Sequence, residues 1–504
     1  MRHRRTLTVA MTALALTMPV SASAVGVPKI NWGTCGPELA QFQCATVEVP
    51  TDYDRPNGST TTIALTRLPA SDPARRIGTL FTNPGGPGAS GVSFIQHNAS
   101  TYSPELRARF DILGFDPRGV GLSDPVTCYP TAAEEGAVLA KLKLFPTTAK
   151  EERGYIADAA KMAASCRKTS PDRLEHYSTA NVARDLDVLR QAVGDKKLNY
   201  IGYSYGTYLG ATYAKLFPNK VRAMVMDGTL LPERYTGSNG DDLPFGARLR
   251  QGEAASDSYQ QFLLECKKAA AACPLNALGA PKTVVENLLD RLQSKPIGGF
   301  DYSTTVGIMF DAFYRSDTYP ALAQQLAELA TQPKAQSKAA PARQEDYPSI
   351  GNAMQPCVET RQTGRPLAYP AYADAADQRA PHFGRYRAWI GIQCEFLGLT
   401  DTDAFAGPFE NRVKPPVLVF GTRHDPATPY QATRPFANLW PDARMVTIEG
   451  WGHATSFGAS VCADELLTKY LTTLAAPPDG STCQQDRKPF DPLPIGKSVT
   501  SSIR

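Results

Sequence analysis

The chain is poor in histidine, carries no excess of charge of either sign and has few long apolar runs. Lys and Arg number 53 against 49 Asp and Glu, a formal net charge of +4. This near balance provides no basic field for nucleic acid or for anionic lipid. Beyond residues 1–24, no stretch is long and apolar enough to cross a bilayer. We therefore expect no nucleic-acid partner and no membrane anchor.

Metal and nucleotide motifs are also missing. No C-x-x-C pair is accompanied by a second pair or by histidines, so zinc is not indicated. The glycine-rich segment 83–91 lacks the Lys-Ser/Thr ending of a phosphate-binding P-loop, and its two prolines remove N–H donors. The sequence therefore predicts an activity that needs neither metal nor cofactor.

Residues 1–24 are typical of a secretory signal. Three arginines precede an apolar run, and Ala-Ser-Ala at 22–24 suits signal peptidase. A membrane anchor is disfavoured because about fourteen apolar-leaning residues fall short of the ~20 that a spanning helix needs. We expect cleavage after Ala24 and export, by the general route in preference to the twin-arginine route that Arg4 and Arg5 leave open.

The ten cysteines agree with an oxidising destination. Their even number and wide scatter favour disulfides. Connectivity does not follow from sequence. Sequential pairing is the simplest choice, because Cys35 with Cys44 and Cys266 with Cys273 would close short loops.

Ser204 lies in a G-x-S-x-G motif at residues 202–206. An apolar strand-like run, 198–201, precedes it and a helix-like segment, 207–216, follows. This context is typical of a nucleophile elbow, a turn so tight that side chains at the flanking glycines would collide with backbone. The residue after the nucleophile, Tyr205, would then supply one N–H of an oxyanion hole. The other arm is expected from the loop at 83–88 (NPGGPG), which follows a strand-like run at 77–82.

An acid and a histidine follow at later strand ends. Asp425 comes after the strand-like run 415–421, and His453 after 443–448. The order serine, acid, histidine is that of the α/β-hydrolase triad. Asp227, at the end of the strand-like run 221–227, is the alternative acid. The other histidines beyond the leader are interpreted as surface, structural or loop-shaping residues: His97, His176, His382 and His424.

Strand and helix alternate except between about 230 and 400, where the sequence becomes helical. We expect a lid there, because an insertion between core strands lies over the site and selects substrate. The predicted divisions are a signal at 1–24, core at 25–229 and 401–487, lid at 230–400 and tail at 488–504. Segment 331–348 is predicted to be an exposed loop, and Asp116 with Arg118 an internal ion pair.

Together with FDPRGVGLSD at 115–124, GTRHDPATP at 421–429 and Gly452-His453, these motifs resemble those of the secreted bacterial tripeptidyl aminopeptidases, α/β hydrolases related to proline iminopeptidase. The resemblance implies an α/β-hydrolase fold with a mostly parallel central sheet and a large, mainly helical lid. It implies a serine exopeptidase that releases short peptides, typically tripeptides, from free N-termini. It also implies Ser204, Asp425 and His453 as the triad, and Gly85 or Gly86 with Tyr205 as oxyanion donors.

Such an enzyme must bind the substrate ammonium, so acids of the lid should face the site. Glu359 and Glu395, beside two of the cysteines, are the candidates, and the resemblance favours Glu359. The expected partners are peptides or proteins with a free N-terminus, and a monomer is favoured. Two alternatives stay open: a secreted esterase or natural-product-tailoring hydrolase, and a non-catalytic binding protein on a hydrolase fold.

Overall fold

The computed structural model describes residues 26–332, 350–351, 354–456 and 458–492. The predicted signal at 1–24, nearly all of the predicted loop at 331–348 and most of the predicted tail therefore lie outside the described residues.

The described residues form one ten-stranded sheet in the order β1-β2-β3-β5-β4-β6-β7-β8-β9-β10. Strands β1 to β3 and the β3–β5 pair are antiparallel, and every other neighbouring pair is parallel. The strands are β1 (Gly33–Thr34), β2 (Gln43–Pro50), β3 (Thr60–Leu68), β4 (Gly78–Asn83), β5 (Phe110–Phe115), β6 (Leu198–Tyr203), β7 (Val221–Asp227), β8 (Val417–His424), β9 (Ala443–Trp451) and β10 (Ser481–Gln484). The predicted α/β-hydrolase fold with a mostly parallel sheet is confirmed.

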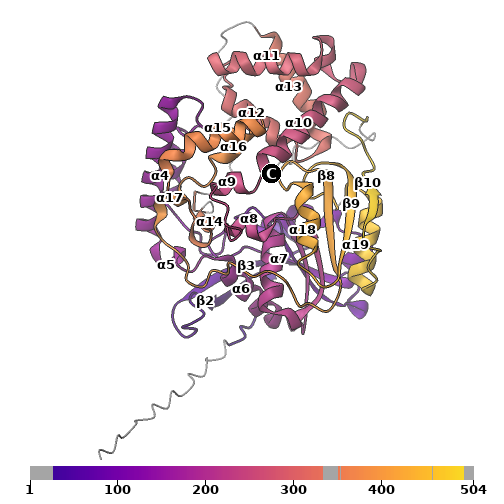
Figure 1. The fold of residues 1–504 in the computed structure, drawn as a ribbon. Helices are drawn as coiled ribbons and strands as arrows, with labels where there is room; N and C mark the ends of the chain where they lie inside the picture. The colour runs from indigo at the N-terminus through magenta and orange to yellow at the C-terminus, as the bar shows by residue number, and fades with distance from the viewer. Residues whose placement is uncertain (1–25, 333–349, 352–353, 457, 493–504) are drawn as a thin grey trace, which may run out of the picture.

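Helices cover both faces of the sheet, and residues 131–195 are mainly helical as predicted (Figure 1). Side chains of α6, α7 and α18 pack on one face, and those of α1, α2 and α19 on the other. Central strands such as β6 are buried along their whole length, which explains why their sequences are mainly apolar. The helices outside the β7–β8 interval are α1 (Gly91–Asn98), α2 (Pro104–Arg109), α3 (Ala132–Leu139), α4 (Ala149–Thr169), α5 (Pro171–Leu174), α6 (Thr179–Ala192), α7 (Tyr205–Leu216), α18 (Thr433–Ala437) and α19 (Val461–Thr473).

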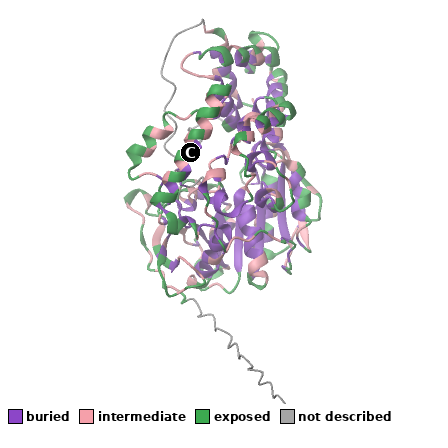
Figure 2. Ribbon diagram, turned by 60° about the vertical axis from the view of Figure 1, so that its left-hand side comes forward, coloured by how far each residue is buried: buried purple, intermediate pink, exposed green. Residues whose placement is uncertain are grey.

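The described α-helices between β7 and β8 lie mostly in a separate layer with its own apolar core, seen above the sheet in Figure 1. They are α8 (Pro232–Thr236), α9 (Phe245–Arg248), α10 (Gln251–Lys268), α11 (Pro281–Ser294), α12 (Tyr302–Ala312), α13 (Tyr319–Thr331), α14 (Gln355–Glu359), α15 (Tyr369–Arg379), α16 (Phe383–Ala388) and α17 (Cys394–Leu397). Figure 2 shows buried residues both in this layer and, more densely, around the sheet. A helical insertion is thus present, while its predicted limits at 230 and 400 stay a prediction.

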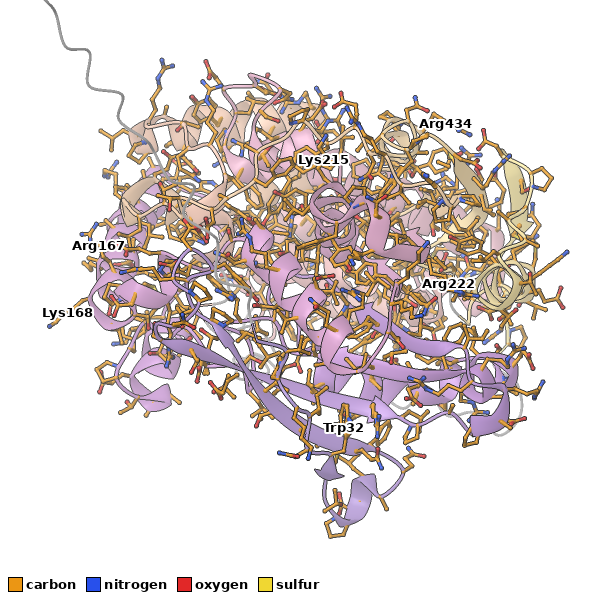
Figure 3. All side chains as sticks on the ribbon, turned by 90° about the horizontal axis from the view of Figure 1, so that it is seen from below. Trp32, Arg167, Lys168, Lys215, Arg222 and Arg434 are labelled. Atoms are coloured by element: carbon orange, nitrogen blue, oxygen red, sulfur yellow. A yellow bond between two sulfur atoms is a disulfide. The ribbon has the colours of Figure 1, made fainter. Side chains whose placement is uncertain are left out.

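The lid lies over the carboxyl ends of the strands. The Ser258 hydroxyl of α10 donates to the carbonyl of His424, the last residue of β8 (3.3 Å). The opposite end of the sheet is seen in Figure 3, where Arg222, at the start of β7, is labelled. Its guanidinium donates to Asn199 Oδ1 (2.7 Å) and to the Leu471 carbonyl (2.9 Å), away from the lid.

All ten cysteines form disulfides, and the sequential pairing is confirmed. The pairs are Cys35–Cys44, Cys128–Cys166, Cys266–Cys273, Cys357–Cys394 and Cys462–Cys483. Among the described residues, no helix combines the length and the apolar character that a membrane crossing requires.

The predicted ion pair between Asp116 and Arg118 is wrong. Arg118 instead pairs with Asp185 of α6, Nη2 to Oδ1 at 2.6 Å, with both side chains buried. Asp116 accepts hydrogen bonds from the Ser90 hydroxyl (2.6 Å) and the Leu122 N–H (2.9 Å). The two side chains therefore fix different loops, one against α6 and the other at the start of α1.

Candidate active site

Ser204 occupies a strained turn between β6 and α7. It is the N-cap of α7 with φ 56° and ψ −124°, a conformation that a residue with a Cβ rarely adopts. A Cβ added to Gly202 would lie 2.3 Å from the Gly206 carbonyl oxygen, and one on Gly206 would lie 2.6 Å from that of Asn83. The structure thus gives both glycines of the motif the steric reason that the sequence predicted.

The glycine loop after β4 lies against this turn. A Cβ on Gly85 would approach Ser204 Cβ to 2.8 Å and the Tyr205 nitrogen to 3.0 Å. The N–H of Tyr205, first in α7, has no intrahelical acceptor. The N–H of Gly85 donates to Asn83 Oδ1 (3.0 Å), so it is engaged within the loop. Of the two candidate glycines, Gly86 is therefore the one we retain for the oxyanion hole.

Asp425 and His453 are brought together. Both carboxylate oxygens lie 2.9 Å from His453 Nδ1. The carboxylate also accepts the N–H groups of Ala427 and Thr428 (2.8 Å each) and the Thr428 hydroxyl (2.7 Å). Since Asp425 is buried, these donors replace water and hold it in one orientation.

The lid contributes to the position of His453. The His453 N–H donates to the carbonyl of Tyr314 (2.9 Å), and the two rings meet edge to face with centroids 5.0 Å apart. Burial alone would lower the pKa of the imidazole, but the charge and hydrogen bond of Asp425 outweigh it and the pKa lies above its usual value.

The end of β7 joins the serine and histidine loops. The Ser204 N–H donates to the Asp227 carbonyl (2.9 Å), and a Cβ on the next residue, Gly228, would lie 3.1 Å from His453 Cε1. The Asp227 carboxylate is fully buried and accepts the Ser456 N–H (2.9 Å). Burial raises its pKa to about 6. Asp425, and not Asp227, is the acid hydrogen-bonded to the imidazole.

The remaining histidines have other partners. A ring nitrogen of His97 contacts Ser93, and one of His424 contacts Asp257. The two ring nitrogens of His382 contact Tyr302 and Glu286. His176 lies near Asp52 and Asp403, with ligand atoms within 4.8 Å of one another. Asp52 already pairs with Arg55 (2.6 Å) and Asp403 with Arg184 (3.5 Å), so cations of the protein occupy this cluster.

Glu359 is connected to the nucleophile elbow by hydrogen bonds through Thr179. Its carboxylate accepts the N–H (2.7 Å) and hydroxyl (2.8 Å) of Thr179, at the start of α6, and the hydroxyl of Tyr235 (2.8 Å). The Thr179 hydroxyl also contacts the Tyr205 hydroxyl (2.5 Å), which links the acid to the elbow. Burial raises the pKa of Glu359 to about 7.

Glu395 has a different environment. Its carboxylate accepts hydrogen bonds from the Thr363 N–H (3.1 Å) and hydroxyl (2.8 Å), the Gly364 N–H (2.8 Å) and the Tyr369 hydroxyl (3.3 Å). Glu395 therefore holds the loop that leads into α15.

Two contacts of the site were missed from the sequence. Thr428 follows Asp425 by three residues, a spacing at which an aspartate commonly accepts hydrogen bonds from its own turn, so local turn chemistry could have indicated it. Tyr314 carried no signal, because its contact with His453 depends on how the lid packs on the sheet.

Comparisons with known proteins agree with this geometry. Residues 78–266 match a family model described as alpha/beta hydrolase fold, and residues 380–483 match one described as TAP-like protein. The chain is 31% identical to serine protease Hip1 of Mycobacterium tuberculosis, over 90% of this chain and 91% of that protein. It is 30% identical to tripeptidyl aminopeptidase of Streptomyces lividans (93% and 89%) and 29% identical to carboxylesterase B of M. tuberculosis (91% and 91%).

Proposed function

Because the chain belongs to the α/β-hydrolase family that includes the tripeptidyl aminopeptidases, we propose that it is a secreted serine exopeptidase that releases short peptides, chiefly tripeptides, from free N-termini. The observation that carries the proposal is the Asp425–His453 pair beside a nucleophile elbow. Five disulfides support an extracellular destination.

In the proposed mechanism His453 is the general base. With Nδ1 donating to Asp425, Nε2 is free to take the proton of Ser204 as its oxygen attacks the scissile carbonyl. The N–H groups of Tyr205 and Gly86 would stabilise the oxyanion. His453 then protonates the leaving amine, and water attacks the acyl-enzyme on Ser204 to release the peptide.

The amine-binding role of Glu359 and Glu395 stays a prediction. Both carboxylates already accept hydrogen bonds from protein groups, so a substrate ammonium would have to be added to these contacts or replace them. Of the two, Glu359 is the better candidate for binding the amine, because Thr179 connects it with Tyr205.

An esterase is the second candidate, because the similarity to a carboxylesterase extends over nearly the whole chain and a triad with an oxyanion hole cleaves esters as well as amides. Peptides with a free and an acetylated N-terminus separate the two. An exopeptidase cleaves the free peptide and releases its first residues, identified by mass spectrometry. Equal rates on both peptides would exclude the exopeptidase, and cleavage of an ester with neither peptide cleaved would favour the esterase. A Ser204→Ala variant should abolish either activity.

A further inference from the structure

Gln485 lies directly after β10, the strand at one edge of the sheet (Figure 1). A disulfide from Cys483, two residues earlier, joins β10 to Cys462 of α19. The Gln485 N–H donates to the carbonyl of Glu449 in β9 (3.1 Å), so its backbone continues the pairing of the two strands. The main chain of Gln485 is therefore held on the sheet, which fixes the point from which its side chain extends.

The side chain of Gln485 joins two segments that are far apart in the chain. Its Oε1 accepts the N–H of Trp451, the last residue of β9 (2.7 Å). Its Nε2 donates to the hydroxyl oxygen of Ser316, in the turn between α12 and α13 of the lid (3.0 Å). A Cβ on Gly450 would lie 2.4 Å from Oε1, so glycine at that position leaves the room that the amide occupies. Gln485 thus connects the lid with the end of β9.

The two connected segments carry His453 and the lid residue that packs on it. After Trp451, Gly452 pairs with Arg315 of the lid turn in an isolated antiparallel bridge. The His453 N–H donates to the Tyr314 carbonyl, and the Tyr314 ring meets the imidazole edge to face. Gly452 has φ 114°, and a Cβ there would lie 2.7 Å from the Tyr314 carbonyl oxygen. The lid turn and the histidine loop therefore meet along their backbones.

We propose that Gln485 is a positioning residue for His453, which rests on the general-base role proposed above. It holds the lid turn and the histidine loop together, so that the imidazole stays within hydrogen-bond reach of the Ser204 hydroxyl. Small displacements of a catalytic group lower the rate steeply, because the reacting atoms must be aligned. Without the amide of Gln485, the Trp451 N–H loses its acceptor and the lid turn loses its link to the end of β10, so the loop can shift.

The rate constant for covalent labelling of Ser204 by a fluorophosphonate measures this role, because labelling requires the general base but no peptide. Gln485→Met keeps the length of the side chain and removes both hydrogen bonds, so labelling should slow roughly three- to tenfold, the range for loss of a neutral hydrogen bond. Gln485→Glu should retain most of the wild-type rate, since its carboxylate can accept from the Trp451 N–H and from the Ser316 hydroxyl. Gln484→Met, at the exposed neighbouring glutamine, is the matched control and should keep the wild-type rate.

A double-mutant cycle with Ser316→Ala separates positioning from a general loosening of the fold. Ser316→Ala alone should slow labelling about threefold. If the two side chains act through their shared hydrogen bond, adding Ser316→Ala to Gln485→Met should slow labelling no further. Thermal unfolding of each variant verifies that it is folded at the assay temperature.

Three results would overturn the inference: unchanged labelling in Gln485→Met, a loss in Gln485→Glu as large as in Gln485→Met, or multiplied effects in the double variant. A wild type that is labelled at Ser204 but removes no peptide from a free N-terminus would refute the exopeptidase function and leave this inference standing. A wild type that is not labelled at Ser204 would refute the triad, and this inference with it.

Discussion

Replacing Asp425 by asparagine tests which buried acid serves His453. In the variant, Oδ1 can still accept the backbone N–H groups of Ala427 and Thr428, so the loop keeps these two hydrogen bonds. The amide NH2 would then face Nδ1 of the imidazole. Nδ1 must accept from it, which moves the ring proton to Nε2, where a base is needed.

The expected loss in kcat is about 10⁴-fold, the magnitude for this tautomer change in serine proteases. Removing the charge that holds the pKa of His453 above its usual value should also lower that pKa. Any residual activity should therefore survive to lower pH than in the wild type, since His453 stays unprotonated there. The measurement is kcat/KM against pH on a tripeptide anilide.

Asp227→Asn is the matched control. Asp227 is also buried, and its side chain accepts the Ser456 N–H, a bond that asparagine can keep. We expect less than about a tenfold change, because the residue makes no hydrogen bond to the imidazole. If Asp227→Asn lost more activity than Asp425→Asn, the choice of acid would be wrong.

Three further substitutions test the surroundings of the triad. Gly85→Ala would place a Cβ 2.8 Å from Ser204 Cβ at φ 98°, so turnover should fall at least about a hundredfold; near-normal rates would exclude the loop from the oxyanion hole. Thr428→Val removes the hydroxyl donor to Asp425 and should cost roughly tenfold or more in kcat with little change in KM, both measured by steady-state kinetics. Glu359→Gln should raise the stability of the fold at alkaline pH. Since burial raises the pKa of Glu359 to about 7, the wild type loses about 3 kcal/mol of folding stability relative to the variant as the pH rises from 4.5 to 7. Urea unfolding at pH 5 and pH 8 measures the free energy of unfolding of both proteins. An equal difference between variant and wild type at the two pH values would refute the raised pKa of Glu359.

Features encoded locally were predictable from the sequence. The elbow at Ser204 could be predicted from a strand, two glycines and a helix that follow one another in the sequence. Each glycine has a close backbone neighbour in the structure. The short disulfide loops at Cys35–Cys44 and Cys266–Cys273 were likewise indicated by spacing. Parallel strands place their carboxyl ends at one edge, which explains why strand-end residues far apart in the chain could be predicted to meet.

Features set by tertiary packing were not predictable. Arg118 pairs with Asp185, 67 positions away, and not with its near neighbour Asp116. The choice between Gly85 and Gly86 depends on where the Asn83 side chain turns. Tyr314 acquires its position only through the packing of the lid segment after α12 on the loop of His453, and helical periodicity does not report such a contact.

The most direct test of the proposed function is product analysis with the purified protein and an unblocked peptide of eight or so residues. Mass spectrometry should detect tripeptides released stepwise from the N-terminus by the wild type, and none from Ser204→Ala. Release of the same products by Ser204→Ala, or cleavage that ignores acetylation of the N-terminus, would contradict the account.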